Sequence, residues 1–176
     1  MLQIYTGNGK GKTTAALGLA VRAVGAGKKV AWIAFDKGGD AHYSERKIIA
    51  ERFPEIDFYA TGLDRIDVRT GRFRMGVTSQ DMEEGERGLS ILNQIFSQAR
   101  HDLVILDEIN CSAELGIVDE QIILDLLEQK PAEMELVLTG RNAPMSFMNL
   151  ADLITEMQLH KHYFYQGVKA RPGFDY

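Results

Sequence analysis

Cysteine and long apolar runs are the scarcest features of this chain of 176 residues. With Cys111 as the one cysteine, an intrachain disulfide and a zinc site made of several thiolates are excluded. We expect Cys111 to be a buried, inert thiol in a protein of the reducing cytoplasm. No apolar run approaches the roughly 20 residues that cross a bilayer, and Met1-Leu2-Gln3 has no basic region ahead of an apolar core. The sequence therefore predicts a protein that is neither exported nor embedded in a membrane.

A basic surface is also missing. The formal net charge is −5, and the lysines and arginines are mostly scattered along the chain. Without a positive field, a nucleic acid is not an expected partner. The exception is segment 61–79, which has no clear period and contains Arg65, Arg69, Arg72 and Arg74. Loops of this length are usually functional or mobile, so these arginines either meet a ligand or are solvated.

The composition is that of an ordinary globular protein, with 45% hydrophobic and 26% charged residues. Its length suits one domain, 1–176. Short apolar runs alternate with segments of helical period, which predicts an α/β fold of the P-loop NTPase type, with a mostly parallel sheet flanked by helices. We expect strands at 2–5, 30–35, 56–60, 103–106, 135–139 and 153–157, the last as an inner strand. Helices are expected up to Gly25 and at 43–53, 78–99, 119–130 and 144–150, with Asp81 completing a capping box at Thr78.

The most informative motif is Thr6–Thr14, called here the phosphate loop, which stands between a predicted strand and a predicted helix. Glycines let the backbone approach phosphate oxygens closely, and a helix N-terminus favours negative charge. Lys12 is expected to reach the outer phosphates and Thr13 to offer its hydroxyl to Mg²⁺. The general pattern has a glycine where this chain has Thr6. The predicted ATP-binding residues of the loop are Gly7, Asn8, Gly9, Lys10, Gly11, Lys12, Thr13 and Thr14.

Charged residues follow three other predicted strands. Asp107 and Glu108 close the run 103–106, where a parallel sheet presents carboxylates to a ligand. With Thr13 they are the expected ligands of Mg²⁺, directly or through water. Arg141, after 135–139, is expected to touch phosphate, and Lys37, after 30–35, to touch a ligand. No Asn-Lys-x-Asp motif specifies guanine, so ATP is favoured over GTP.

Nucleotide binding leaves the reaction open. If water attacks the γ-phosphate with Glu108 as base, the protein is an ATPase or a switch. A small-molecule hydroxyl or carboxylate as nucleophile would make it a kinase or ligase. Attack on the ribose 5′ carbon would release the whole triphosphate, whose charge Lys12, the helix N-terminus and Mg²⁺ would stabilise.

The chain resembles the P-loop type of ATP:corrinoid adenosyltransferases, which include cob(I)alamin adenosyltransferases. The phosphate loop within Tyr5–Ala16 and the C-terminal segments carry the most specific part of this resemblance. The similar segments are Tyr5–Ala16, Arg22–Lys28, Phe35 with Lys37-Gly38, Ala60–Gly62, Leu106–Glu108, Thr139–Arg141, Ala151–Leu153, Glu156-Met157, Lys161–Phe164, Gly167–Ala170 and Gly173–Tyr176.

The resemblance implies transfer of the 5′-deoxyadenosyl group of ATP to the cobalt of a reduced corrinoid, with release of triphosphate. It also implies a homodimer, a possible reductase that supplies Co(I), and ATP bound in the sense opposite to that in ordinary P-loop enzymes. The loop residues Gly7–Thr14 would hold the triphosphate, with Mg²⁺ near Thr13 and Glu108. Lys12, Thr13 and Glu108 are then the catalytic candidates, and Lys37, Leu63 and Arg65 the corrinoid candidates.

Two departures from the family stand out. Many relatives have an N-terminal helical extension over the site, whereas this sequence starts at the first predicted strand. Better-known members also carry aromatic residues after the Ala-Thr-Gly segment that help to displace the lower ligand of the corrinoid. Here Gly62 is followed by Leu63-Asp64-Arg65. Because the extension is missing, we expect closure over the corrinoid either to come from other parts of the protein or to be weaker.

Overall fold

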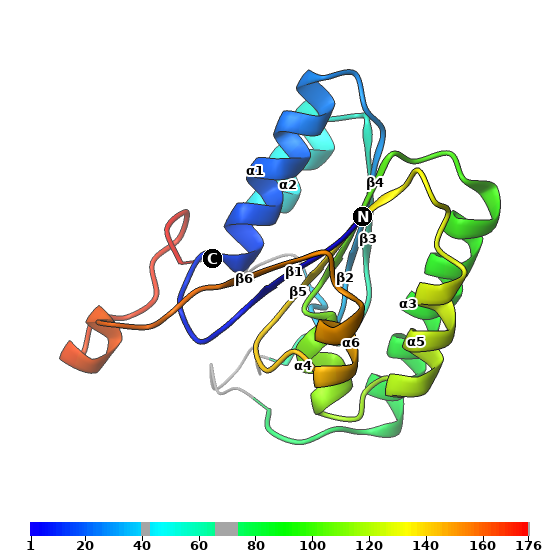
Figure 1. Ribbon diagram of the computed structural model, residues 1–176. Helices are drawn as coiled ribbons and strands as arrows, with labels where there is room; N and C mark the ends of the chain where they lie inside the picture. The colour runs from blue at the N-terminus through cyan, green and yellow to red at the C-terminus, as the bar shows by residue number, and fades with distance from the viewer. Residues whose placement is uncertain (40–42, 66–73, 176) are drawn as a thin grey trace.

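A parallel sheet forms the centre of the protein (Figure 1). The structure, a computed structural model, describes residues 1–39, 43–65 and 74–175. The six strands are β1 (Leu2–Thr6), β2 (Val30–Ala34), β3 (Ile56–Ala60), β4 (Leu103–Asp107), β5 (Glu135–Thr139) and β6 (Leu153–Glu156). Their order is β3-β2-β4-β5-β1-β6, and every pair is parallel. The predicted α/β fold with a parallel sheet is confirmed.

Helices cover both faces of the sheet. In Figure 1, α1 (Lys12–Gly25) and α2 (Ser44–Arg52) lie on one face, and α3 (Ser79–Gln98) and α5 (Glu120–Glu128) on the other. Strand residues alternate between the two apolar cores, so that Ile105 packs on the side of α1 and Leu106 on the side of α3. Short helices α4 (Ile109–Glu114) and α6 (Met145–Leu150) follow β4 and the turn after β5. No described helix is both long and apolar enough to cross a membrane.

Because all strands are parallel, their carboxyl ends meet at one edge of the sheet. The phosphate loop leaves β1 there, and β5 separates β1 from β4. The segments that follow β2, β4 and β5 reach the same edge, which is where open α/β sheets bind ligands.

One expected position in the sheet is wrong. Residues 153–157 were expected to be an inner strand, but β6 is the edge strand and pairs with β1 alone among the described strands. Its apolar residues Leu153 and Ile154 are each 46% exposed. The apolar residues of β6 suggested a buried, inner strand. Its position in the sheet is determined instead by its pairing with β1, which is distant in sequence.

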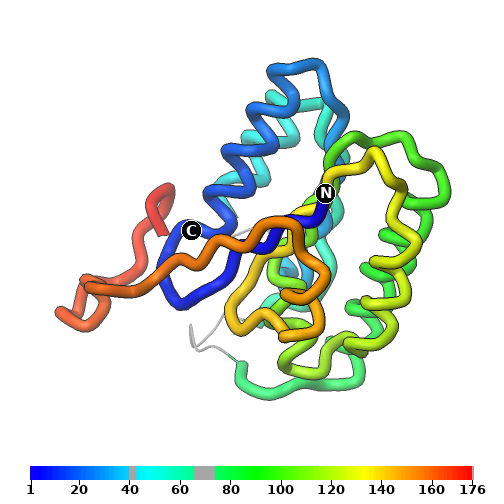
Figure 2. The backbone as a smooth tube through the Cα atoms, in the orientation of Figure 1, coloured from blue at the N-terminus to red at the C-terminus, as the bar shows by residue number. Residues whose placement is uncertain are grey.

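Beyond β6 the chain continues as residues 157–175, called here the strap. It leaves the sheet edge, contains the short 3-10 helix η1 (Tyr163–Gln166), and bends back toward the start of α1 (Figure 2). Backbone bonds fix its beginning to the phosphate loop: Met157 N–H donates to Thr6 O at 2.8 Å, and Gly9 N–H donates to Met157 O at 2.6 Å. The beginning of the strap therefore continues the β1–β6 ladder along the phosphate loop.

Candidate functional site

The phosphate loop closes around the ammonium group of Lys12. Gly11 is the N-cap of α1 with φ 119°, a left-handed conformation that favours glycine. Lys12 Nζ donates to the carbonyl oxygens of Gly7 at 2.7 Å and Gly9 at 2.8 Å. Burial lowers the pKa of Lys12. The loop thus holds a desolvated cation at the start of a helix, next to where a triphosphate would bind.

Two glycines of the loop are also required by the strap. A Cβ at Gly7 would lie 2.5 Å from Met157 O, and one at Gly9 would lie 2.6 Å from the same atom. By contrast, a Cβ at Gly11 would meet nothing within 4 Å. The close approach expected for phosphate at Gly7 and Gly9 is made here by the strap backbone. Thr6, in the place of the usual glycine, accepts a hydrogen bond from Ala143 N–H at 3.3 Å.

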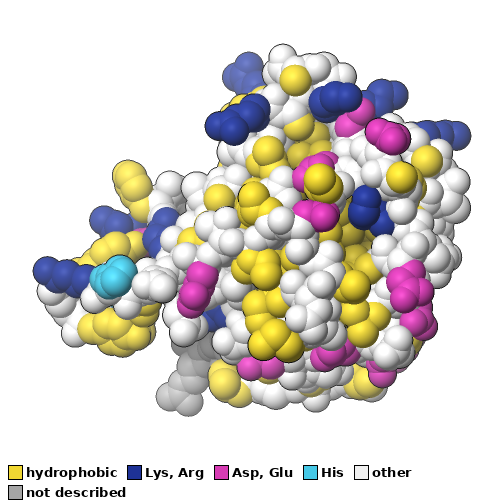
Figure 3. Space-filling model, in the orientation of Figure 1, with side chains coloured by type: hydrophobic (Ala, Val, Ile, Leu, Met, Phe, Trp, Pro, Cys, Tyr) yellow, Lys and Arg dark blue, Asp and Glu magenta, His cyan; other side chains and the backbone are white. Residues whose placement is uncertain are grey.

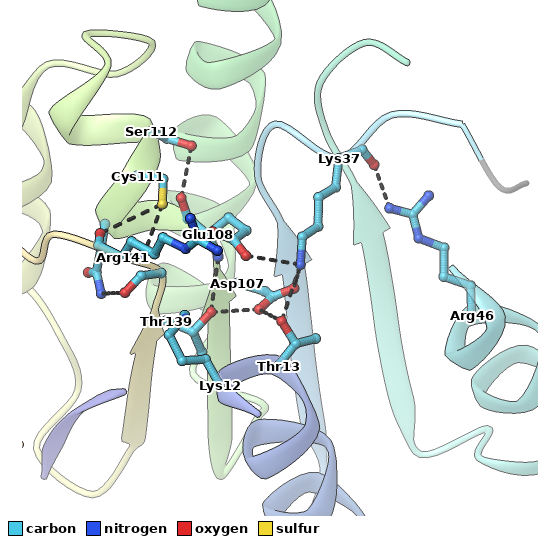
Figure 4. A network of polar contacts seen from close by, with 12 residues as sticks. Lys12, Thr13, Lys37, Arg46, Asp107, Glu108, Cys111, Ser112, Thr139 and Arg141 are labelled. Carbon is cyan, nitrogen blue, oxygen red and sulfur yellow. Dashed lines mark hydrogen bonds and ion pairs between the residues drawn. The ribbon is translucent and has the colours of Figure 1, made fainter. Parts of the chain in front are cut away.

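Asp107 is the centre of the polar network at this edge (Figure 4). Its carboxylate is buried and accepts hydrogen bonds from the hydroxyls of Thr13 at 3.0 Å and Thr139 at 2.6 Å. The sequence assigned no role to Thr139, whose place at the end of β5 beside β4 is the signal that could have revealed it. The Thr139 hydroxyl also accepts from Glu108 N–H at 3.1 Å, so it links both acids.

Lys37 lies among the same oxygens. Its ammonium is 2.6 Å from Asp107 Oδ2, 3.2 Å from Thr13 Oγ1 and 3.5 Å from Glu108 Oε1 (Figure 4). Burial on its own would lower the pKa of Lys37, but Asp107 and Glu108 outweigh it and raise the pKa. The turn that carries Lys37 is held by Arg46, whose guanidinium donates to the carbonyl oxygens of Lys37 and Gly39.

The donor set suits Mg²⁺. Thr13, Asp107 and Glu108 provide oxygens, and Mg²⁺ commonly takes one or two carboxylates while phosphates and water complete its shell. No group of three or more His, Cys, Asp or Glu side chains that could hold a metal is found among residues 1–39, 43–65 and 74–175. A Mg²⁺ ion held by these oxygens would compete with Lys37 for them.

Glu108 has an unusual backbone conformation. Its φ is 62°, in the left-handed region that costs energy for a residue with a Cβ, and such strain clusters at functional sites. Local bonds hold this conformation: the Glu108 carbonyl accepts from both the N–H and the hydroxyl of Ser112, each at 3.0 Å. The Glu108 side chain remains 26% exposed, so it can meet a ligand.

Arg141 and Cys111 adjoin Glu108 in the network. Arg141 N–H donates to Cys111 Sγ at 3.1 Å, and the Arg141 side chain is exposed. Burial, followed by the charge of Glu108, raises the pKa of the Cys111 thiol to about 12. At neutral pH the thiol is protonated, which agrees with the inert role expected for it. The expected full burial is wrong, because Cys111 is partly exposed.

The three corrinoid candidates lie near the ends of β2 and β3. A Cβ at Gly38 would lie 2.4 Å from the backbone carbon of Leu63, so the two turns are packed tightly. Arg65 is buried; its Nε is 2.7 Å from Asp36 Oδ1, and it donates to Gly76 O at 2.8 Å. The contact of these residues with a corrinoid stays a prediction. Arg69 and Arg72 lie outside the described residues.

The end of segment 61–79 is fixed by Asp81. The expected capping box is confirmed: Thr78 Oγ1 accepts from Asp81 N–H at 3.3 Å, and Asp81 Oδ2 accepts from Thr78 N–H at 2.8 Å. Arg74 adds two hydrogen bonds to the Asp81 carboxylate at 2.9 and 2.6 Å. Arg74, then Thr78, hold the pKa of Asp81 well below its usual range.

Replacing Asp81 by asparagine should lower the free energy of unfolding by about 1–3 kcal/mol at neutral pH, because the cap and the Arg74 pair are lost. A carboxylate with a depressed folded pKa stabilises above its ordinary pKa, and this stability fades as pH falls below about 4. The difference between wild type and Asp81→Asn in urea denaturation should therefore shrink from about pH 6 to about pH 3. Glu83→Gln, exposed on the same helix, is the control. A constant difference across this range would contradict the assignment.

The predicted nucleotide residues border one cavity. Its volume is about 570 Å³, within the range of small-ligand sites. The phosphate-loop residues Asn8–Thr14 line it, together with Glu108 and Arg141. Gly7 and Asp107, which were also predicted for the site, are not among the residues that line it. The opposite wall is the strap, which the sequence did not assign to the site. Parallel sheet, phosphate loop and acidic strand end together define a P-loop nucleotide-binding protein.

Comparisons with known proteins identify the family to which the chain belongs. Residues 1–176 match the model of the family ATP:corrinoid adenosyltransferase BtuR/CobO/CobP. The chain therefore belongs to this family, as the resemblance indicated. It is 34% identical over 178 residues to a corrinoid adenosyltransferase of Sinorhizobium sp, covering 100% of this chain and 80% of that one. For a corrinoid adenosyltransferase of Escherichia coli the identity is 32% over 180 residues, covering 98% and 84%.

Two further matches are less informative about function. An uncharacterised protein of Nostoc sp. is 35% identical over 186 residues, and this chain spans 99% of its own length but only 48% of that relative. The crystal structure of a KaiC-like protein from Pyrococcus horikoshii is 16% identical, with a TM-score of 0.55, and covers 92% of this chain and 73% of that one. The structural match supports the P-loop type of fold alone.

Proposed function

We propose that the protein transfers the 5′-deoxyadenosyl group of ATP to the Co(I) centre of a reduced corrinoid and releases triphosphate. The observation that carries this proposal is that Asn8–Thr14, Glu108 and Arg141 border one cavity in a chain that matches the adenosyltransferase family throughout. Residues 1–176 would then be a single adenosyltransferase domain.

The reaction needs little acid or base catalysis. The electron pair of Co(I) forms the bond to the ribose 5′ carbon, the bond from that carbon to oxygen breaks, and its electron pair leaves with triphosphate. Cobalt is formally oxidised to Co(III). The protein must align the two reactants, exclude water and stabilise the departing charge.

The residues divide these tasks. Lys12, the backbone of the phosphate loop and Arg141 hold the triphosphate, and Thr13, Asp107 and Glu108 would hold Mg²⁺. That ion, when bound, neutralises phosphate charge. Lys37, Leu63 and Arg65, near the ends of β2 and β3, are the residues proposed for the corrinoid side. The proposal further includes a cytoplasmic homodimer, with Co(I) supplied by a reductase.

Identification of the phosphate product tests the proposal. The protein is incubated with Mg-ATP, with and without chemically reduced cob(I)alamin, and the products are separated by anion-exchange chromatography. Triphosphate that appears only with the corrinoid, together with the absorbance change of a new cobalt–carbon bond, is the expected result. ADP and phosphate formed without corrinoid would instead identify an ATPase, for which Glu108 is the candidate base.

A further inference from the structure

The strap is attached to the phosphate loop by the fold itself. The β1–β6 ladder pairs Thr6 with Glu156, and the bonds of Met157 to Thr6 and Gly9 continue it. Gly7 and Gly9 leave no room for a Cβ between loop and strap. These contacts place the beginning of the strap, at Met157, directly against the phosphate loop.

Internal contacts fix the shape of the strap. Asp175 accepts hydrogen bonds from the Tyr163 hydroxyl and from Arg171, whose N and Nε lie 3.0 and 3.1 Å from Asp175 Oδ2. The guanidinium of Arg171 also stacks 4.7 Å from the centre of the Tyr163 ring. The strap thus forms a closed loop in which the Tyr163 ring is held before any ligand arrives.

The two walls of the cavity differ in chemistry. The wall of phosphate-loop residues carries backbone N–H groups, Lys12 and Thr13. The strap wall carries the rings of Tyr163, Phe164 and Tyr165, smaller apolar groups, and two titratable side chains, His162 and Asp175. Phe164 and Tyr165 are 66% and 77% exposed, and Figure 3 shows the strap as a projecting arm on which apolar and basic side chains gather. Large aromatic faces this exposed commonly serve to bind a partner or ligand.

We propose that the strap is the base-binding wall of the nucleotide site, with Phe164 and Tyr165 stacking on the adenine of ATP. A ligand with phosphates at one end and a flat ring at the other matches the two walls, because it spans both within one cavity of about 570 Å³. Aromatic side chains stack on bases with little selectivity, which fits a wall that presents ring faces. This assignment rests on the proposed function only for the identity of the nucleotide.

Calorimetric binding of two probes tests the assignment. Mg-ATP carries triphosphate and base, whereas magnesium tripolyphosphate carries the phosphates alone. Phe164→Ala and Tyr165→Ala should each weaken ATP binding by about tenfold, the effect of losing one stacking ring. Tripolyphosphate should bind these variants as it binds the wild type, within about twofold. Because both side chains are mostly exposed, their removal should not unfold the protein.

Phe174→Ala is the matched control. Phe174 is 69% exposed and lies on the strap, but it does not line the cavity. It should leave both affinities unchanged. Equal weakening of ATP and tripolyphosphate, or no weakening of either, would overturn the proposal. Unchanged ATP affinity with a raised KM for the corrinoid would overturn it too, and would place the strap against the corrin ring. ATP binding can be measured without turnover. If the Phe164 and Tyr165 variants lose affinity for ATP but not for tripolyphosphate, and the wild type forms no triphosphate, the proposed reaction is refuted but the strap assignment stands.

Discussion

Replacing Lys37 by methionine should destabilise the protein by about 3 kcal/mol, because it leaves the buried Asp107 carboxylate without its cation. The ammonium and carboxylate are 2.6 Å apart, and their side chains are 14% and 2% exposed. Methionine keeps most of the length and the apolar stem of lysine, so the loss reports the charge. The hydroxyls of Thr13 and Thr139 remain on Asp107, which places the effect at the lower end for a broken buried pair.

Urea denaturation of a double-mutant cycle measures this pair. Asp107→Asn removes the other charge, so the double variant Lys37→Met/Asp107→Asn should lose clearly less stability than the two single losses added together. Additivity within about 0.5 kcal/mol would show that the two side chains do not stabilise one another. Lys47→Met, on the exposed side of α2, is the control and should change stability by less than about 0.5 kcal/mol.

The same pair shows what the sequence could and could not predict. Lys37, Asp107 and Glu108 were all placed at the ligand edge, because each follows an apolar run that reads as a strand, and parallel strands share one edge. Their mutual contact depends on the strand order, which places β4 directly beside β2. A pattern along the chain gives the type of each element but not its neighbour, so the Lys37–Asp107 ion pair could not be predicted.

Features formed by residues close together in the sequence were predicted correctly, because they do not depend on the strand order. The capping box of Thr78 and Asp81 involves residues three apart, and the turn from β1 into α1 is encoded by closely spaced glycines and Lys12. Helix α4 was missed because its six residues are too few to show a period, and it begins after the strained backbone of Glu108. Such strain is set by the surroundings, since it is held by bonds to Thr139 and Ser112.

The strap is the largest part of the cavity wall that the sequence did not predict. Its contact with the phosphate loop joins Gly9 to Met157 across most of the chain, and it exists only because β6 pairs with β1 at the edge. Glycines in the loop were sufficiently explained by phosphate binding, so nothing indicated that Gly7 and Gly9 also make room for another backbone. Glycine at these two positions would suit both phosphate binding and contact with the strap, and the sequence pattern predicts only phosphate binding.

Replacing Lys12 by methionine should lower kcat for adenosyl transfer by about 10²–10³-fold, the usual cost of removing one group that stabilises developing negative charge. Stability should change by less than about 1 kcal/mol, because two hydrogen bonds to loop carbonyls are lost while a desolvated charge is removed. Lys12→Met and Lys37→Met should thus differ in stability: Lys12→Met should lose activity in a stable protein, whereas Lys37→Met should be destabilised.

Steady-state rates at saturating cob(I)alamin, with triphosphate as the measured product, separate the roles of Lys12. In the proposed reaction, triphosphate gains charge as the carbon–oxygen bond breaks. Lys12 should then act more strongly on the transition state than on bound ATP, and kcat should fall by more than KM rises. Lys28→Met, at an exposed pair with Asp102, is the control and should retain full activity. A loss confined to KM would mean that Lys12 holds ATP equally well before and during bond breaking. The leaving group would then be stabilised by the N-terminus of α1 and by Mg²⁺, and not by Lys12.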